Sequence, residues 1–238
     1  MISTNFKHLF IFLFSFLVLS GVGRAETISV NFDNEVTGAP SKIFSSFVGN
    51  WYIENDGNNK VYAVDGRQWM RGTMSAGIAD KAKALYGERY AEFLNNLTAY
   101  KYFPLTIYQR VENLSNGAIT VDFKAISGRI DQAAGIAFNI QPNGDYLVIR
   151  ANPLENNLIA FKMQRGERSM VQWIRNVPTP SLKWHHLKVL IKDEQVEAYL
   201  NNKRYIAFKF NKKIDGKIGL WSKADSYVLF DNFTVETK

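Results

Sequence analysis

The feature that most restricts the fold of this chain is an alternation of apolar and polar residues, which repeats from about residue 104 to the end. In short runs every second residue is apolar, and turn residues separate one run from the next. A period of two is typical of a strand that buries one face, because successive side chains point to opposite sides of a sheet. The eleven runs are LTIYQRV, AITVDFKAI, AGIAFNI, DYLVIRAN, NLIAFKMQ, SMVQWIRNV, WHHLKVLIK, QVEAYL, RYIAFKF, KIGLWS and SYVLFDNFTV.

The links between these runs carry turn residues. They are SNG at 115–117, PNGD at 142–145, RGE at 165–167, DE at 193–194, NN at 201–202 and DG at 215–216. Asn and Gly accept the positive φ that tight turns need, so the pattern predicts that most of these links are short hairpins. So many short strands at this spacing predict an all-β sandwich or jelly roll. Further strands are predicted at 27–32, 49–54, 60–66 and 67–72.

One segment, residues 79–100, breaks the period of two. Its apolar residues are spaced four, three, four and three, which is one face of a helix, and Asp80 is placed to cap it. Such a helix either covers the sandwich or roofs one end of a binding groove, and the sequence leaves both open. The apolar residues of this face are Tyr86, Tyr90, Phe93, Leu97 and Tyr100.

Residues 1–25 form a unit of their own. Lys7 and His8 precede eleven apolar or small residues, LFIFLFSFLVL, and small residues lead to Ala25. This order is typical of a secretory signal peptide cleaved after Ala25, and its apolar core is short for a membrane span. An uncleaved N-terminal anchor is the alternative. The pattern therefore predicts an exported protein in which residues 26–238 form a single domain, with no membrane span after signal cleavage.

The chain contains no cysteine, which excludes disulfides and thiolate metal sites or nucleophiles. Export without cysteine fits a bacterial periplasmic or secreted protein. Removing residues 1–25 takes away Lys7 and Arg24 and no acid, which lowers the formal charge from +7 to +5. Because no run of five like charges occurs, we expect no nucleic-acid partner. The mild basicity suits an anionic glycan or envelope surface.

Three segments, taken in order, resemble the concanavalin A-like jelly roll. They are AGIAFNIQPNGDYLVIRANPLENNLIAFKMQRGER, WHHLKVLIKDEQVEAYLNNKRY and DGKIGLWSKADSYVLFDNFTV. They look most similar to the group of 3-keto-disaccharide hydrolase or family-16-glycoside-hydrolase-like domains. The resemblance covers about residues 27–236 and is strongest over 133–235. It implies a jelly-roll β-sandwich with a short helical insertion at about 79–100, and it specifies this fold better than any activity.

Alternation along the middle strands assigns their residues to two faces. If Ile107, Ile149 and Phe161 point into the core, the opposite face carries rings and planar or charged groups. Sugars bind such faces because their C–H surfaces stack on rings while their hydroxyls find fixed donors and acceptors. A solvated outer face is the alternative. The resemblance favours binding, and the predicted carbohydrate-binding residues are Tyr108, Arg110, Asn139, Tyr146, Arg150 and Lys162.

The segment GLWSKADSYVLFDNFTV places two carboxylates among apolar residues. Asp225 sits where a short acceptor can bond the following backbone N–H groups and start the last strand. Asp231 shares the parity of apolar neighbours, and a buried carboxylate is costly unless it is paired, hydrogen-bonded or metal-bound. A bulge at Asp231 and Asn232 would rotate it outward. The alternative, suggested by sugar-binding jelly rolls with Ca²⁺ between their first and last strands, is a structural Ca²⁺ site of Asp33, Glu35 and Asp231.

No catalytic residue can be assigned from the sequence. A family-16 glycosidase needs a Glu-X-Asp-X-X-Glu or similar motif that points its acid and nucleophile to one face, and no such motif occurs. In WHHL, alternation places His185 on the apolar face and His186 on the polar face, which favours a structural role for His185.

The sequence leaves three possible functions open. The first is an exported carbohydrate-binding protein that engages a glycan on a concave sheet face, which the missing pair of catalytic carboxylates favours. The second is a glycoside-cleaving enzyme of the 3-keto-disaccharide hydrolase type, for which one base and an electrophile would suffice. The third is an envelope protein-interaction module without sugar specificity.

Overall fold

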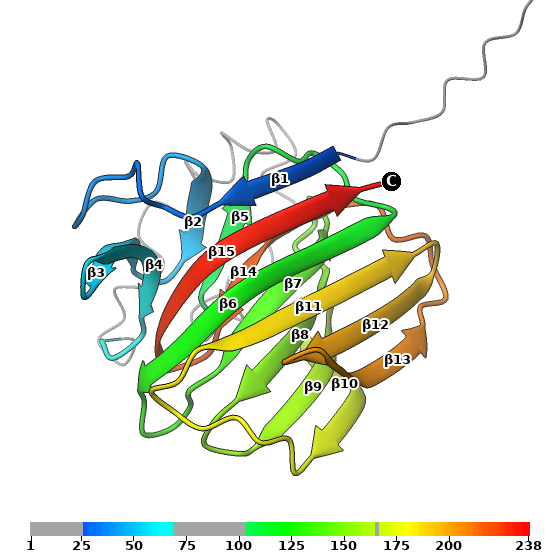
Figure 1. The fold of residues 1–238 in the computed structure, drawn as a ribbon. Helices are drawn as coiled ribbons and strands as arrows, with labels where there is room; N and C mark the ends of the chain where they lie inside the picture. Colours follow the sequence, from blue (N-terminus) through cyan, green and yellow to red (C-terminus); the bar gives the residue numbers. More distant parts are fainter. Residues whose placement is uncertain (1–25, 69–102, 165–166) are drawn as a thin grey trace, which may run out of the picture.

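The computed structural model describes residues 26–68, 103–164 and 167–238. They form a sandwich of two antiparallel sheets (Figure 1). Sheet A has the order β13–β12–β11–β6–β15–β4–β3, and β1 also pairs with β15. Sheet B has the order β10–β9–β8–β7–β14–β5–β2. Within the described residues, no helix is long and apolar enough to cross a membrane.

The strand bounds are as follows. Sheet A contains β1 (Glu26–Val30), β3 (Trp51–Asp56), β4 (Asn59–Asp65), β6 (Gly117–Ser127), β11 (His185–Lys192), β12 (Gln195–Leu200), β13 (Lys203–Lys209) and β15 (Tyr227–Thr237). Sheet B contains β2 (Phe44–Val48), β5 (Leu105–Tyr108), β7 (Ala134–Ile140), β8 (Tyr146–Asn152), β9 (Asn157–Gln164), β10 (Glu167–Arg175) and β14 (Lys217–Ser222).

All eleven strands predicted after residue 104 are confirmed, as are those near 27–32, 49–54 and 60–66. Strand β2 was not predicted, because Phe44 and Phe47 are three residues apart and break the period of two. The β2–β5 register shifts between Ser46 and Val48, and Phe47 and Val48 both belong to the outer cluster while Phe44 lies between the sheets. The predicted helix at 79–100, and most of the predicted strand at 67–72, lie outside the described residues.

The space between the two sheets is filled by apolar side chains. At its centre five aromatic rings pack with centroids 5.0 to 6.0 Å apart, in tilted, stacked and edge-on pairs. The buried hydroxyl of Tyr62 lies 3.1 Å from Ser46 Oγ and 3.0 Å from Thr106 Oγ1. The rings are those of Phe32, Phe44, Tyr62, Tyr108 and Phe233.

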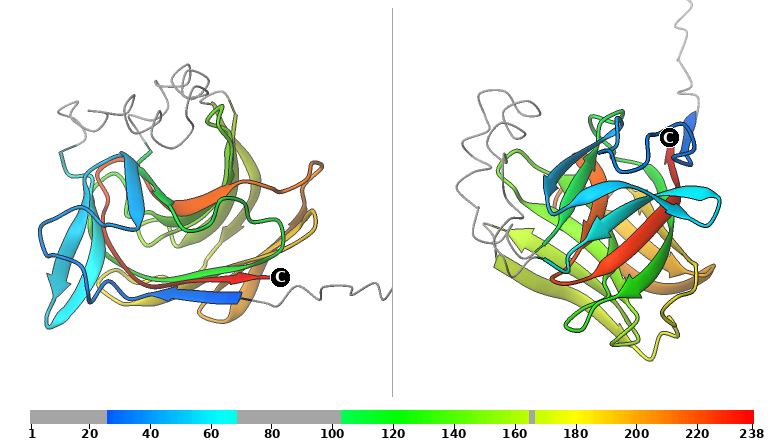
Figure 2. Two further views of the ribbon diagram at one scale, coloured as in Figure 1. Left: turned by 90° about the horizontal axis from the view of Figure 1, so that it is seen from above. Right: turned by 90° about the vertical axis from the view of Figure 1, so that its left-hand side faces the viewer.

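The central strands of sheet B are buried on both of their faces. Every residue of β7, β8 and β14 is buried. One face forms the core between the sheets, and the outer face carries a second apolar cluster that includes Val148, Phe161 and Trp221. Figure 2 shows that sheet B curves away from sheet A, so that this outer face is concave. The predicted concave polar face of the middle strands is therefore largely apolar.

This double burial corrects the predicted orientation of two strands. Ile107 and Phe161, which we expected in the core between the sheets, belong to the outer cluster, whereas Tyr108 lies between the sheets. Where both faces of a strand are buried, apolar residues occupy both parities and alternation no longer identifies the inner face. Ile136 and Ile149 lie between the sheets as predicted.

Four of the six predicted hairpin links join neighbouring antiparallel strands, at PNGD, RGE, DE and NN. Asn201 and Asn202 have φ of 49° and 65°, as a two-residue hairpin turn requires. The other two links, SNG and DG, are not hairpins. SNG precedes β6 and DG precedes β14, and each lies where the chain passes from one sheet to the other.

Candidate binding site

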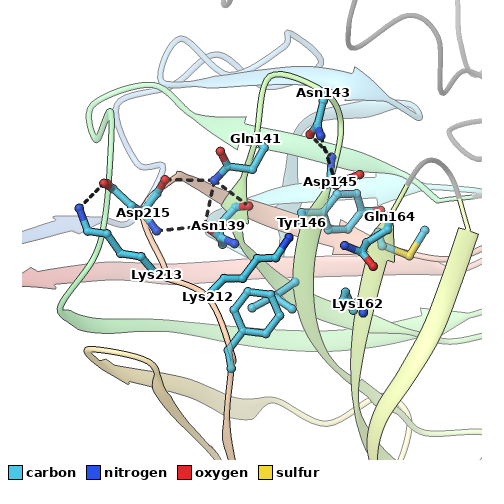
Figure 3. A pocket seen from close by; sticks show the side chains of 13 residues that line it. Asn139, Gln141, Asn143, Asp145, Tyr146, Lys162, Gln164, Lys212, Lys213 and Asp215 are labelled. Carbon is cyan, nitrogen blue, oxygen red and sulfur yellow. Dashed lines mark hydrogen bonds and ion pairs between the residues drawn. The ribbon is translucent and has the colours of Figure 1, made fainter.

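A pocket of about 360 Å³ opens at one end of the sandwich (Figure 3). Three segments form it: the β7–β8 hairpin, the end of β9, and the connection from β13 to β14. Its lining is rich in side-chain amides and lysines, with a ring at its floor. The lining residues are Asn139, Gln141, Asn143, Asp145, Tyr146, Leu147, Lys162, Met163, Gln164, Phe210, Lys212, Lys213 and Asp215.

The wall nearest β14 is built on a bulge at Asn139. Its φ is 52°, and the β7–β14 register shifts between Lys217 and Gly219. Asn139 Oδ1 accepts hydrogen bonds from Gln141 Nε2 at 2.9 Å and from the backbone N–H of Asp215 at 3.0 Å. Gln141 Nε2 also donates to the carbonyl of Asp215 at 3.0 Å. These bonds fix the hairpin to the connection that crosses between the sheets.

Gly216 permits this close contact. A Cβ at this position would lie 2.7 Å from Gln141 Nε2 and 2.8 Å from the carbonyl carbon of Asn139. A backbone neighbour cannot move aside as a flexible side chain can, so any larger residue would separate the bulge from the β13–β14 connection. The DG pair predicted as a hairpin turn thus serves close packing at the pocket wall.

The tip of the β7–β8 hairpin forms the opposite rim. The backbone N–H of Asp145 donates to Asn143 Oδ1 at 3.0 Å, and Asn143 Nδ2 donates to Asp145 Oδ2 at 3.2 Å. Gly144 between them has φ of 81°, which glycine adopts without strain. The hairpin therefore holds an amide and a carboxylate in defined positions at the pocket mouth.

The charges of the pocket are unequally paired. Lys213 Nζ lies 2.6 Å from Asp215 Oδ2 in an exposed ion pair. Within the described part of the chain, Lys162 and Lys212 take part in no ion pair, and the Gln164 amide has no hydrogen-bond partner. Lys162 is half-buried at the end of β9, and the half-exposed ring of Phe210 packs against the core. Three groups able to bind a polar ligand thus lie beside an aromatic ring.

Three of the six predicted carbohydrate-binding residues, Asn139, Tyr146 and Lys162, come together in this pocket. Tyr146 is structural as well, because its hydroxyl accepts a hydrogen bond from Trp221 Nε1 at 3.1 Å. Burial raises the pKa of Tyr146 well above its usual value, so the phenol stays neutral. Sequence reasoning missed Gln164 and Phe210, which end predicted strands, and it did not select Lys212 or Lys213.

The other three predicted residues lie elsewhere. Tyr108 is in the core between the sheets. Arg150 is buried, and its guanidinium donates to Asn157 Oδ1 at 2.9 Å and to Glu155 Oε2 at 2.8 Å. Arg110 is exposed and lines a separate pocket of about 250 Å³ beside β1. The predicted six-residue face is therefore not continuous.

Asp225 has a different role from the one predicted. Its carboxylate accepts hydrogen bonds from the backbone N–H groups of Arg129, Ile130 and Asp131 at 2.8 to 3.1 Å, in a distant loop and not in the following strand. Burial raises the pKa of the Asp225 carboxyl, but these backbone donors outweigh it and hold the pKa below its usual value. Asp225 therefore ties the β14–β15 turn to the β6–β7 loop.

The bulge predicted at Asp231 and Asn232 is confirmed. The β15–β6 register shifts between Asp231 and Thr234, and Asn232 has φ of 49°. Asp231 accepts hydrogen bonds from Asn59 Nδ2 and from the backbone N–H of Asn232, both at 2.7 Å. Burial, with the nearby charges of Asp122 and Asp33, raises the pKa of the Asp231 carboxyl.

The residues proposed to hold calcium do not form one group. The Glu35 carboxylate accepts bonds from Ser41 Oγ at 2.7 Å and from the backbone N–H of Lys42 at 2.9 Å. The ammonium group of Lys60 donates to the carbonyls of Asp33 and Glu35. Among the described residues, no three acids or histidines are grouped as a metal site requires. The calcium site stays a prediction from the sequence.

The two histidines of WHHL divide as their alternation predicts. His185 is buried, lies 2.9 Å from the carbonyl of Pro180 through Nε2, and packs on Phe123. His186 is half-exposed on the outer face of sheet A, where its Nδ1 lies 2.7 Å from Asp122 Oδ1. Asn232 Nδ2 donates to the other oxygen of Asp122 at 2.9 Å. His185 is thus a core residue, and His186 belongs to a small polar cluster.

Comparison with known proteins establishes the architecture. No family model matches the sequence, and no curated protein matches it. The carbohydrate-binding module CBM66 from Bacillus subtilis superposes with a TM-score of 0.57 at 16% identity, over 84% of this chain and 99% of that chain. A Bacillus subtilis protein of unknown function with a galectin-like fold has a TM-score of 0.51 at 13% identity, over 85% and 99%. The chain has a jelly-roll fold.

A larger protein contains the same jelly roll. A sialidase superposes with a TM-score of 0.52 at 9% identity, covering 89% of this chain and 18% of the sialidase. At such identities the likeness concerns the fold alone.

Proposed function

We propose that this protein binds carbohydrate in the pocket at the end of its jelly roll. The observation that carries the proposal is the lining itself, in which planar amides surround an aromatic ring. Amides offer paired donors and acceptors to sugar hydroxyls, and rings stack on sugar C–H surfaces. The similarity in fold to CBM66 supports the proposal, as does the pocket's content of three residues that the sequence had already selected.

The test is glycan binding by two pocket variants. Gln164→Ala removes an amide that has no hydrogen-bond partner among the described residues, and Phe210→Leu removes the ring while it keeps apolar packing on the core. We expect each to weaken binding about three- to tenfold, as measured by isothermal titration with a ligand selected on a glycan array. Gln68→Ala, in the exposed segment after β4 at the other end of the sandwich, is the matched control. Equal affinity of all four proteins would contradict the proposed site.

The enzyme alternative rests on one observation. Of the described histidines, His186 alone contacts a carboxylate, and a carboxylate that orients an imidazole is a common arrangement for a general base. If the protein cleaves 3-keto-disaccharides, mass spectrometry should detect the products, and His186→Asn should abolish them. Cleavage that His186→Asn leaves unchanged would exclude this base.

Export, calcium binding and protein interaction are proposals from the sequence. Secretion from a bacterial cell predicts a mature N-terminus at Glu26, which intact-mass measurement of the processed protein would verify.

Calcium binding predicts a higher Tm in Ca²⁺ than in EDTA, and equal Tm values would contradict it. For an interaction module, exposed Met170 and Trp173 on β10 are the residues to substitute, with loss of envelope-protein crosslinks as the expected result.

A further inference from the structure

We infer that the ligand of this pocket is an acidic saccharide, whose carboxylate or sulfate group is bound by Lys162 and Lys212. This inference rests on the proposed function and names the ligand class. It starts from the two lysines, which enter the pocket from separate elements (Figure 3). Lys162 belongs to β9, and Lys212 to the connection between β13 and β14.

The pairing of the other charges leaves these two ammonium groups available. The pocket contains three lysines and two carboxylates. Asp215 is occupied by Lys213, and Asp145 is held at the hairpin tip by Asn143. Neither carboxylate has an ion pair with Lys162 or Lys212 in the described structure. The pocket therefore carries excess positive charge where a ligand would lie.

The position of Lys162 is hard to explain by stability. It is half-buried, and it shares the inward parity of Leu158 and Ala160, which face the core between the sheets. A partly desolvated cation without a counter-ion costs free energy that an apolar residue would not. An anion in the pocket would offset that cost, and the bond would be charge-assisted.

The neutral groups indicate that the anion belongs to a sugar. An inorganic anion needs only donors, whereas the Gln164 amide presents a carbonyl acceptor as well as an N–H donor. Hydroxyl groups are donors and acceptors at once, so they match this amide. The ring of Phe210 adds a surface for stacking. An acidic group on a hydroxylated ring uses all of these features together.

The test compares acidic and neutral polymers that share a backbone. Polygalacturonate and its methyl ester share a sugar backbone and differ in the carboxylate charge. Dextran sulfate and dextran likewise differ in the sulfate group. We expect the protein to bind at least one acidic polymer about tenfold or more tightly than its neutral partner, with an affinity that falls as salt rises. The two pairs distinguish a carboxylated from a sulfated ligand.

Variants locate the effect. Lys162→Gln and Lys212→Gln should each weaken acidic-polymer binding about fivefold to tenfold and thereby reduce the preference for the acidic over the neutral polymer. Lys162→Arg and Lys212→Arg, which keep the charge, should retain most of the preference. Lys183→Gln, in the β10–β11 connection at the opposite end of the sandwich (Figure 1), is the matched control and should bind as the unmodified protein does. Thermal unfolding verifies that every variant folds.

The contrary outcomes are distinct. If acidic and neutral polymers bind equally and Gln164→Ala weakens both, the acidic ligand is wrong and the carbohydrate site stands. If the preference is real but Lys183→Gln reduces it as much as the pocket variants do, diffuse surface charge explains it and the inference is wrong. If no polymer or arrayed glycan binds, the inference and the proposed function both fail.

Discussion

Individual charged side chains hold together the end of the sandwich opposite the pocket. Asp131 is fully buried, forms an ion pair with Lys223 and accepts a hydrogen bond from Asn152 Nδ2 at 2.6 Å. Together with the backbone bonds to Asp225, this pairing connects the β6–β7 loop to the β8–β9 and β14–β15 links. The region is therefore fixed by polar contacts whose strength depends on pH.

We predict that Asp225→Asn costs about 1–3 kcal/mol of unfolding free energy at pH 7, because an amide offers one acceptor where three N–H donors converge. The lowered pKa of Asp225 means that its stabilisation is present above about pH 4 and is lost as the pH falls through the folded-state pKa. Urea unfolding at pH 7 and pH 3 measures both effects. Asp193→Asn, at an exposed turn, should change stability by less than about 0.5 kcal/mol. A pH-independent loss would contradict the assignment.

Removing the partner of Asp131 should also cost less on acidification, but because a buried carboxylate loses its counter-ion. Burial raises the pKa of Asp131 even with Lys223 present, so its ionised form is unfavourable in the folded state. We expect Lys223→Met to destabilise the protein by about 3–5 kcal/mol at pH 7, and by less as falling pH protonates the carboxyl. Denaturant unfolding at pH 7 and pH 5 tests this, with Lys183→Met as control. A cost that grows on acidification would show that the pairing is not the cause.

At the scale of the strands, alternation predicted which segments are strands, but it assigned the wrong face to residues of β5 and β9 in sheet B. The resemblance and the period of two located every strand after residue 104, since hydrophobic period and turn residues are local properties. The site depends on non-local facts: the central strands of sheet B are buried on both faces, and the bulge at Asn139 shifts parity near the pocket. Tyr108 was assigned to the outer face, and it lies between the sheets, because both faces of its strand are buried. Phe210 was not selected because its partners come from distant strands.

The bulge and Gly216 act as one unit, which predicts a linked loss of stability and binding. Gly216→Ala should cost about 1–3 kcal/mol, because its Cβ meets the backbone of Asn139. It should also weaken glycan binding, since the same contact positions the pocket wall. Gly57 has φ of 65° and open space around it, so Gly57→Asn is a control expected to affect neither property strongly. Chemical unfolding and titration calorimetry provide the two readings, and full affinity in a destabilised Gly216→Ala protein would separate the bulge from the site.

At the scale of the whole molecule, the two ends of the jelly roll differ in character. One end is tied by paired charges, and at the other Lys162, Lys212 and the Gln164 amide line a pocket without an ion pair or side-chain hydrogen bond among the described residues. The central strands of sheet B are apolar on both faces, so they cannot contribute a polar groove without exposing that core. The proposed ligand binding therefore lies at one end of the sandwich, apart from the contacts that stabilise the rest.

The most direct test of acidic-saccharide binding in this pocket is a ¹H–¹⁵N NMR titration of the protein with acidic oligosaccharides. We predict chemical-shift changes concentrated in residues 139–145, 162–164 and 210–215, including the side-chain amides of Gln164 and Asn143. Shift changes confined to the outer face of sheet A, around His186 and Asp122, or none at any ligand concentration, would contradict it.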